Sequence, residues 1–374
     1  MKKLAILLLA TFVALPALAG KPLRFTVSQG VTYDDNIYLT SDDEKDSVIS
    51  STRVGAQYKT NVPGSGLKFT ADALAGYNAY TEKPSKNNYW DALAAVDLSN
   101  ETFSVGDRFI HTAAPANNSL DERAKRMQNT GYLSWQSSKD KTLGIGFDIS
   151  DIYDYYFDKD WDALNRNRFN AGAKLIYNVS SKTNFFAEYI FSDITYNTNK
   201  QNNSNGHTFG VGVNGQLAPK VTGTAKVTYA MRDYEHDKAG ADNYADLVGY
   251  YVETTWKPSA HDTIRLSGER SMEETLFANN RYYVDTNVSL YAAHEFLSKW
   301  TASITLAYDN MAYPKKVGDV KRKDDYFSVR PELDYQFKDW LSAGVWYNFT
   351  TRGSKLHYAE YDRNRVGAFV RAMF

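Results

Sequence analysis

The chain contains no cysteine among its 374 residues. Disulfide bonds, thiolate metal sites and cysteine nucleophiles are therefore excluded. No apolar run reaches 18 residues, so no membrane-spanning helix is expected. Neither sign of charge predominates, because 43 basic and 44 acidic residues give a formal net charge of −1, which is not the pattern of a nucleic-acid-binding protein. His-Glu-x-x-His and nucleophile-elbow motifs are also missing, and the sequence indicates no cofactor and no metal ion.

The first 19 residues have the pattern of a secretory signal peptide. Lys2 and Lys3 precede an apolar stretch at residues 4–15, and residues 17–19 read Ala-Leu-Ala. This order predicts cleavage before Gly20 and a single mature domain over residues 20–374. Cleavage would remove two lysines and no acidic residue, which changes the formal net charge from −1 to −3.

Aromatic residues are abundant in a chain that is polar on average. They make up 14% of the sequence, and tyrosine alone supplies 28 residues, yet the mean hydropathy is −0.51. Strands with one face in lipid and the other in water produce this combination, because apolar and polar residues then alternate.

Alternation with a period of two runs along the chain from residue 23 onward. In residues 327–337, aromatic and aliphatic residues mostly occupy odd positions and polar residues occupy even positions, with Pro331 as the exception. Residues 143–149, 221–229 and 341–349 repeat the pattern. A half-solvated soluble sheet also shows such alternation, but here aromatic residues cap many of the apolar faces, as the interfaces of a membrane require.

The connectors between these segments alternate between short and long. Long connectors are expected near residues 40–47, 81–88, 112–124, 154–166, 196–207, 233–243, 272–280, 311–325 and 351–359. Short periplasmic turns and longer outer loops are typical of bacterial outer-membrane barrels, which also have even strand numbers. The sequence therefore predicts an all-β fold: one antiparallel, up-and-down, transmembrane β-barrel of about 18 strands in the outer membrane.

The last segment resembles the signal that outer-membrane barrels present to the barrel-assembly machinery, which is therefore an expected partner. Counting back by twos from the terminus gives an apolar face of Phe374, Ala372, Val370, Ala368 and Val366. Arginines occupy the opposite face at positions 363, 365 and 371.

Two stretches carry a resemblance to a known family. Residues 29–38 contain the string Tyr-Asp-Asp-Asn-Ile-Tyr, and the closing stretch has Tyr361, Arg363, Asn364 and Val366. Both resemble the Putative β-barrel porin 2 family, whose members often accompany exopolysaccharide-synthesis genes. The resemblance implies an outer-membrane pore that exports an exopolysaccharide or capsular polysaccharide. It also implies contacts with lipopolysaccharide, the polysaccharide and periplasmic export components.

If the apolar faces point to lipid, the opposite faces form a polar lumen. The candidate path-lining residues are Arg53, Lys68, Arg108, Lys174, Lys226, Arg265, Arg330, Glu332, Asp334, Trp346, Arg365 and Arg371. Their guanidinium groups and rings could contact a passing solute, or their charges could pair off across neighbouring strands and stiffen the wall. A possible gating loop at 311–325 carries a basic cluster of Lys315, Lys316, Lys321, Arg322 and Lys323.

Three alternatives to polysaccharide export stay open. The first is a general or substrate-selective porin for small solutes. The second is a non-conducting adhesin or structural barrel. The third is a hydrolase at the barrel rim, which the six scattered histidines do not support; Glu273 and Glu274 are adjacent, so they are expected on opposite faces of a strand. Asp34, Asp35 and Asn36 are interpreted as a solvated turn rather than a cation site.

Overall fold

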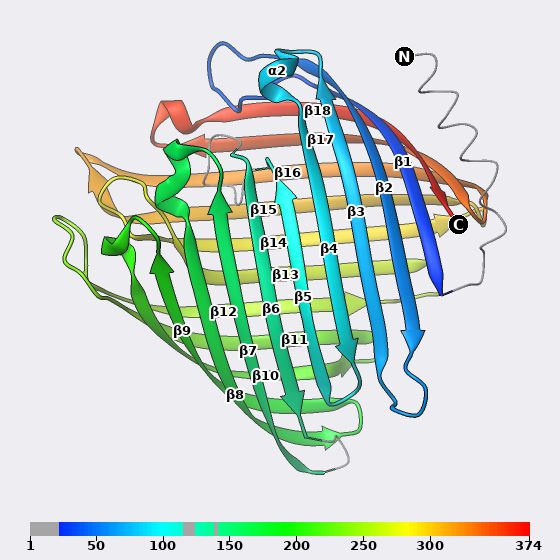
Figure 1. The fold of residues 1–374 in the computed structure, drawn as a ribbon, viewed down its shortest axis with the longest axis horizontal. Helices are drawn as coiled ribbons and strands as arrows, with labels where there is room; N and C mark the ends of the chain where they lie inside the picture. The colour runs from blue at the N-terminus through cyan, green and yellow to red at the C-terminus, as the bar shows by residue number, and fades with distance from the viewer. Residues whose placement is uncertain (1–21, 115–123, 138–140) are drawn as a thin grey trace.

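The computed structural model describes residues 22–114, 124–137 and 141–374, so the expected signal peptide lies outside the described residues. Within them the chain forms one sheet of eighteen strands (Figure 1). The strands are β1 (Leu23–Asp34), β2 (Ser47–Asn61), β3 (Lys68–Tyr80), β4 (Tyr89–Ser99), β5 (Phe103–Thr112), β6 (Arg126–Gln136), β7 (Leu143–Tyr156), β8 (Arg166–Ser180), β9 (Thr183–Tyr196), β10 (Ser204–Ala218), β11 (Val221–Tyr234), β12 (Tyr244–Trp256), β13 (Asp262–Glu274), β14 (Tyr282–Phe296), β15 (Trp300–Val317), β16 (Val320–Lys338), β17 (Leu341–Ser354) and β18 (Tyr361–Met373).

The sheet closes on itself. β1 pairs antiparallel with β2 on one side and with β18 on the other. At the end of this closing seam, the backbones of Phe25 and Phe374 exchange two hydrogen bonds of 3.0 and 2.9 Å. Every strand is therefore bonded to two neighbours, and the predicted closed, antiparallel barrel is confirmed together with its strand number.

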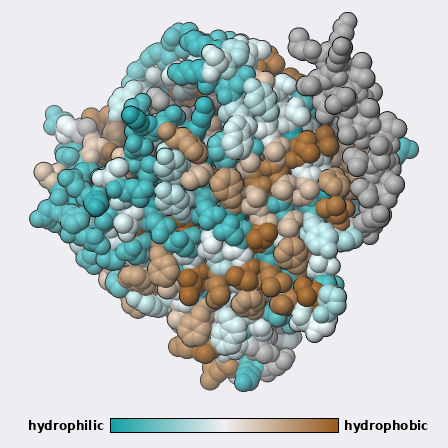
Figure 2. Space-filling model, in the orientation of Figure 1, coloured by the Kyte–Doolittle hydropathy of each residue, from teal (hydrophilic) through white to brown (hydrophobic). Residues whose placement is uncertain are grey.

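The two faces of the strands differ in character. Outward-facing aliphatic side chains are well exposed, and Val211 in the middle of β10 is 63% exposed. Stacked or tilted ring pairs flank this apolar wall, with Trp300 and Tyr335 4.6 Å apart at one end and Trp90 and His111 3.6 Å apart at the other. Figure 2 shows hydrophobic side chains over the strands and hydrophilic ones toward the end with the long connectors. This distribution is that of a wall in contact with lipid.

Long and short connectors lie at opposite ends of the barrel, as the sequence predicts (Figure 1). The long ones hold the few short helices: α2 (Pro84–Asn87), η2 (Lys159–Leu164), η3 (Lys200–Asn202) and η4 (His357–Ala359). None of the helices in the described ranges is long and apolar enough to cross a membrane.

The segment at 311–325 is not a loop, and this expectation was wrong. β15 and β16 continue through it as a long hairpin that turns at Gly318, whose φ is +58°. Met311 and Tyr313 are buried against Tyr283, so large apolar side chains continue on the inner face of β15 despite its lysine-rich composition. The backbone pairing of β15 with β16 therefore continues beyond these buried side chains.

An ionic contact joins two of the outer connectors. The His357 ring lies 2.9 Å from Glu360 through Nδ1 and 3.2 Å from Asp42 through Nε2. The hydrogen bond to Glu360 and the charge of Asp42 raise the pKa of His357 above its ordinary value, and the same bond lowers the pKa of Glu360. η4 is thereby linked to the connector that follows β1.

The exposed wall makes a prediction about stability. Val211→Arg places a cation at the middle of a lipid-facing strand and should lower the free energy of unfolding by about 2–4 kcal/mol. Thr130→Arg places the same charge on the lumen face of β6 and should cost much less. Urea unfolding in phospholipid vesicles measures both. Equal losses in the two variants would contradict the assignment of the faces.

The outer contact makes a prediction about pH. The protonated imidazole holds both carboxylates, so the contact is complete where the imidazole is charged and the carboxylates are ionised, and it is lost as the pH rises through the raised pKa of His357. Hydrogen exchange in residues 41–46, corrected for intrinsic rates, should therefore accelerate through that pH range. In His357→Gln this step should be absent; a step that persists there would mean that another group titrates.

Candidate functional site

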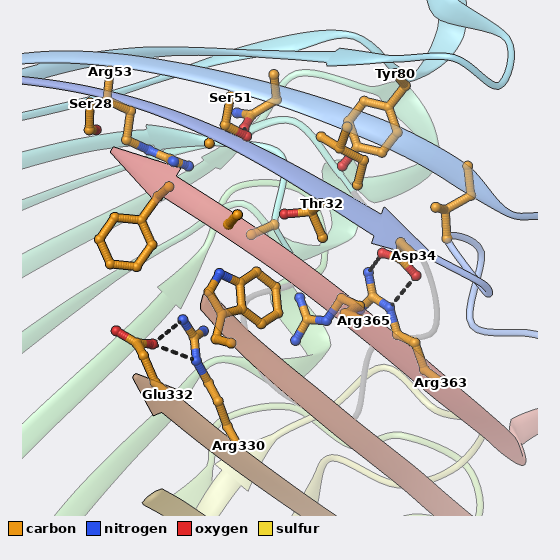
Figure 3. Close-up of a pocket in the computed structure, with 18 of the residues that line it drawn as sticks. Ser28, Thr32, Asp34, Ser51, Arg53, Tyr80, Arg330, Glu332, Arg363 and Arg365 are labelled. Atoms are coloured by element: carbon orange, nitrogen blue, oxygen red, sulfur yellow. Dashed lines mark hydrogen bonds and ion pairs between the residues drawn. The ribbon is translucent and has the colours of Figure 1, made fainter. Parts of the chain in front are cut away.

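An arginine-rich cavity of about 460 Å³ lies on the lumen side of the barrel wall (Figure 3). β1–β4 and β16–β18 contribute its lining. Its basic residues are Arg53, Arg330, Arg363, Arg365 and Arg371. We call this cavity the arginine pocket. Against five guanidinium groups its lining has only two carboxylates, Asp34 and Glu332.

Asp34 neutralises one of these arginines. Arg363 donates from Nε to Asp34 Oδ1 at 2.9 Å and from its second nitrogen, Nη2, to Oδ2. Asp34 is fully buried, and its Oδ1 also accepts from the Asn36 backbone at 3.2 Å. The Asn36 side chain in turn bonds the carbonyls of Thr40 and Asp362. The turn is therefore buried, which corrects the expectation of a solvated junction.

A second pair stands beside an indole ring. Arg330 bonds Glu332 at 2.7 and 3.2 Å, and its guanidinium lies 4.3 Å from the centre of the Trp346 ring. Arg365 approaches the same ring at 5.9 Å. Asp334 lies two residues beyond Glu332 along β16. Trp346 therefore lies within range of two guanidinium groups, only one of which is ion-paired.

Arg365 and Arg371 form no close ion pair, although Asp34 acts on Arg365 and Asp334 acts on Arg371 at longer range. No carboxylate of the described residues lies within 4.0 Å of either side chain. The Nε atom of Arg365 is buried and has no hydrogen-bond partner within the described part of the chain. Arg371 contacts the Phe369 ring at 5.0 Å, and Arg53 has a long contact of 3.3 Å to Asp91. The arginine pocket therefore carries uncompensated positive charge.

Two of the candidate lumen cations pair off. Lys226 lies 2.6 Å from Glu188, and Lys174 lies 2.8 Å from Asp148 and 3.9 Å from Glu188. The ammonium group of Lys226 also lies over the Tyr251 ring at 5.5 Å. These contacts join β7, β8, β9 and β11, and they stiffen the wall.

The remaining three candidates lie elsewhere in the barrel. Arg108 lines a separate cavity of about 690 Å³ together with Asp97. Arg265 lies over the Tyr291 ring at 5.3 Å. Lys68 is the exposed first residue of β3, next to a short turn. The structure does not bring these three residues to the arginine pocket.

The five cations of the expected gating loop lie on the β15–β16 hairpin. Arg322 is 2% exposed, contacts Asp324 at 2.7 Å and lies over the Phe277 ring at 4.5 Å. Lys315 pairs with Asp242 at 2.6 Å. The exposed members of the cluster are Lys316, Lys321 and Lys323. The gating role itself stays a prediction.

The C-terminal apolar face is only partly exposed. Val366 and Val370 are exposed on the outer wall, and Ala368 accompanies them. Ala372 and Phe374 are buried, and the Phe374 ring stacks with Trp340 at 5.5 Å. Recognition by the assembly machinery stays a prediction.

A second cavity lies between the arginine pocket and the outer connectors. It measures about 670 Å³ and shares Ile37, Leu39 and Tyr89 with the pocket. We call it the outer vestibule. Its basic residues are Lys45, Lys83, Lys86 and Lys125. A hydrogen bond from Lys45 lowers the pKa of Asp43, so one of its acids stays ionised over a wide pH range.

Sequence reasoning missed a buried ion cluster at the outer ends of β8, β11 and β13. Arg166 contacts Glu274 at 3.0 Å, and Arg232 contacts the other oxygen of that carboxylate. This bridge links β8 to β13 across four intervening strands. Glu273 and Glu274 both belong to the lining of a cavity of about 270 Å³. β13 stops pairing with β12 at Arg270 but keeps an unbroken register with β14 through Glu274, so the two adjacent side chains keep the alternation that the sequence predicts.

One Ser, one Asp and one His do converge, at a short turn. Ser259 donates to Asp262 at 2.5 Å, and His294 Nδ1 lies 2.7 Å from the other carboxylate oxygen. In a hydrolase triad the histidine stands between the serine and the carboxylate. Here the carboxylate stands between the other two, and the Ser259 hydroxyl also accepts from the His261 backbone. The arrangement is that of a turn stabilised by side chains.

No group of three or more His, Asp or Glu side chains in the described ranges is placed to hold a metal ion.

Several solved outer-membrane channels share the fold. OccAB4 of Acinetobacter baumannii is 14% identical, with a TM-score of 0.50 over 94% of this chain and 98% of that one. OpdK of Pseudomonas aeruginosa is 10% identical, with a TM-score of 0.52 over 94% and 99%. OccK2 (OpdF) of Pseudomonas aeruginosa, in complex with glucuronate, is 10% identical, with a TM-score of 0.51 over 94% and 96%. No curated protein matches the sequence.

A family model matches more than half of the chain. The family is described as Putative beta-barrel porin 2, and the match covers residues 155–374. It includes the ion cluster and the β16–β18 side of the arginine pocket. The chain therefore belongs to the Putative beta-barrel porin 2 family and is an outer-membrane β-barrel porin.

Proposed function

We propose that the protein is a substrate-selective porin that admits small anionic solutes, above all carboxylates. The observation that carries this proposal is the pair Arg365 and Arg371, neither of which forms an ion pair within 4.0 Å in the described part of the chain. A guanidinium group binds a carboxylate through two parallel hydrogen bonds. A passing carboxylate would therefore supply the partner that the wall lacks.

A contact across the inside of the barrel favours small solutes over a polymer. The Arg166–Glu274 bridge joins β8 to β13 across four intervening strands, and a polysaccharide chain would have to pass it. The cavities of about 270 to 690 Å³ in the wall are of a size that binds a solute of one or two rings. Polysaccharide export, which came from the family resemblance, finds no support in these features.

Two channels of the same fold were solved with carboxylates. OpdK was crystallised with vanillate, and OccK2 was crystallised in complex with glucuronate. At 10% identity these channels share only the fold with this chain. They nevertheless support the choice of carboxylates as the first solutes to test.

Transport follows from weak, successive contacts. The lining of the outer vestibule has four lysines and three acids, Asp42, Asp43 and Asp158. This small excess of positive charge raises the local concentration of anions, and the attraction falls with ionic strength. The anion then exchanges hydration for contact with Arg365 and Arg371, next to the Trp346 ring. Because the guanidinium groups already stand in the wall, little reorganisation is needed, and binding stays weak enough for release.

The test compares variants of equal charge. Arg365→Gln/Arg371→Gln should lower glucuronate flux into proteoliposomes about tenfold, because local steering of the anion is lost, while glucose flux stays unchanged. The same variant should shift the zero-current potential in a KCl gradient toward cation preference. Lys68→Gln/Arg265→Gln removes two charges outside the arginine pocket and serves as the matched control. Equal loss in both variants would mean that only the total charge matters, and unchanged flux in the first would refute the assignment.

Polymer export is tested by a further conductance measurement. A long anionic polysaccharide added on the side of the short turns should leave the conductance nearly unchanged. A sustained block that the Arg365→Gln/Arg371→Gln variant relieves would return polysaccharide export to first place.

A further inference from the structure

The wall has one seam that backbone pairing joins along only half its length. β12 and β13 each contain thirteen residues, but only seven register pairs connect them, from Tyr250↔Arg270 to Trp256↔Ile264. Toward the outer end, β12 continues to pair with β11, and β13 continues to pair with β14. The two strands therefore separate above Arg270. We call this unpaired stretch the β12/β13 seam.

The separation begins where two backbones meet closely. A Cβ atom on Gly249 would stand 2.3 Å from the Arg270 carbonyl oxygen, so only glycine fits there. Just beyond, the Arg270 guanidinium donates a hydrogen bond to the Val248 carbonyl. A side chain thus bonds a carbonyl on the edge of β12 that no longer pairs with β13.

Side chains, not a ladder, close the β12/β13 seam. Ala245 and Leu247 on β12 and Met272 on β13 form a buried apolar cluster, with exposures of 4%, 8% and 8%. Breaking side-chain contacts requires no loss of inter-strand backbone hydrogen bonds, which elsewhere hold a barrel wall shut in lipid. Among the seams of the described residues, this one has the fewest register pairs.

The lumen side of the seam has an amphipathic lining. The cavity of about 270 Å³ beside it is lined by Ile190, Ile194, Leu247 and Met272. The same cavity also contains Arg168 and Arg232, together with Glu269, Glu273 and Glu274. Arg232 is held by Glu274, but the buried Nε of Arg168 has no hydrogen-bond partner within the described part of the chain. The cavity therefore offers an apolar surface for an alkyl chain and, at Arg168, a guanidinium donor for an anionic headgroup. The outward face at this height is apolar as well, because Val248 is 61% exposed.

We propose that the β12/β13 seam is a lateral passage through which an anionic amphiphile, a carboxylate with an alkyl chain, moves between the lumen and the outer leaflet. The proposal uses the anion-admitting lumen of the proposed function but adds a second substrate class and a second exit. The headgroup contacts Arg168 while the chain follows the apolar cluster outward. The seam opens by parting Leu247 from Met272 and closes again through the Arg270–Val248 contact.

A disulfide lock tests the passage, because the chain has no cysteine of its own. Leu247→Cys/Met272→Cys should tie the seam shut when oxidised. Uptake of radiolabelled dodecanoate by cells that carry this variant should fall to the level of cells without the protein, and a reducing agent should restore it. Glucuronate uptake in the same cells should stay unchanged.

A disulfide between two fully paired strands serves as the matched control. Val54 and Ala75 are register partners on β2 and β3, and Val54→Cys/Ala75→Cys should change neither uptake. Arg270→Gln removes the hydrogen bond across the seam and should raise dodecanoate uptake alone; the heat-modifiable mobility of each variant checks its folding.

The outcomes separate the two proposals. Normal dodecanoate uptake by the oxidised seam variant would overturn the lateral passage. A parallel loss of dodecanoate and glucuronate would overturn it too, because both solutes would then share one axial path. Dodecanoate uptake that depends on the seam, in a protein that never admits glucuronate, would support the passage and refute the small-anion porin.

Discussion

The structure depends on the need to satisfy every backbone hydrogen bond in a wall that faces lipid. A strand edge in hydrocarbon has no water to bond, so an open sheet is not viable and the sheet must close. Closure is made by β1 and β18, whose register brings Asp34 opposite Arg365 and Ser28 opposite Arg371. The same pairing that completes the wall therefore also assembles the arginine pocket.

The closed wall places its charged side chains inward. Some of its cations are held by a neighbouring carboxylate, and others are not. Lys174, Lys226 and Arg330 have carboxylates within 3 Å, so their charge is spent on neighbouring strands. Arg365 and Arg371 lie on β18, where the adjacent lumen positions of β1 carry Ser28 and Thr32 but an acid only at Asp34. Arg363 already holds that acid through two bonds. β18 therefore keeps a net positive charge, because Asp34 is the one acid of β1 beside its three arginines.

Local patterns predicted the fold because successive side chains of a strand point to opposite faces, which gives the sequence a period of two. Strand number, connector asymmetry and the inward positions of Arg53, Arg330 and Trp346 all follow from that period. Prediction from the local sequence failed where contacts between distant residues decide the structure. Lys315, Lys316, Lys321 and Lys323 make 311–325 look like a loop, yet buried Met311 and Tyr313 hold it as a hairpin. Arg166 and Glu274 are 108 residues apart in the chain, and no local sequence pattern predicts that they are in contact.

The buried position of Glu274 has the same physical origin as the β12/β13 seam. β13 loses its pairing with β12 at Arg270 but keeps its register with β14. Freed on that side, the strand presents Met272 and Glu274 to the lumen, where Glu274 is held by Arg166 and Arg232. The ion cluster thus anchors the free end of β13 to β8 and β11 in place of a ladder. A wall that is closed here by charges and apolar side chains can exchange these contacts for those of an amphiphile without unpairing any strand.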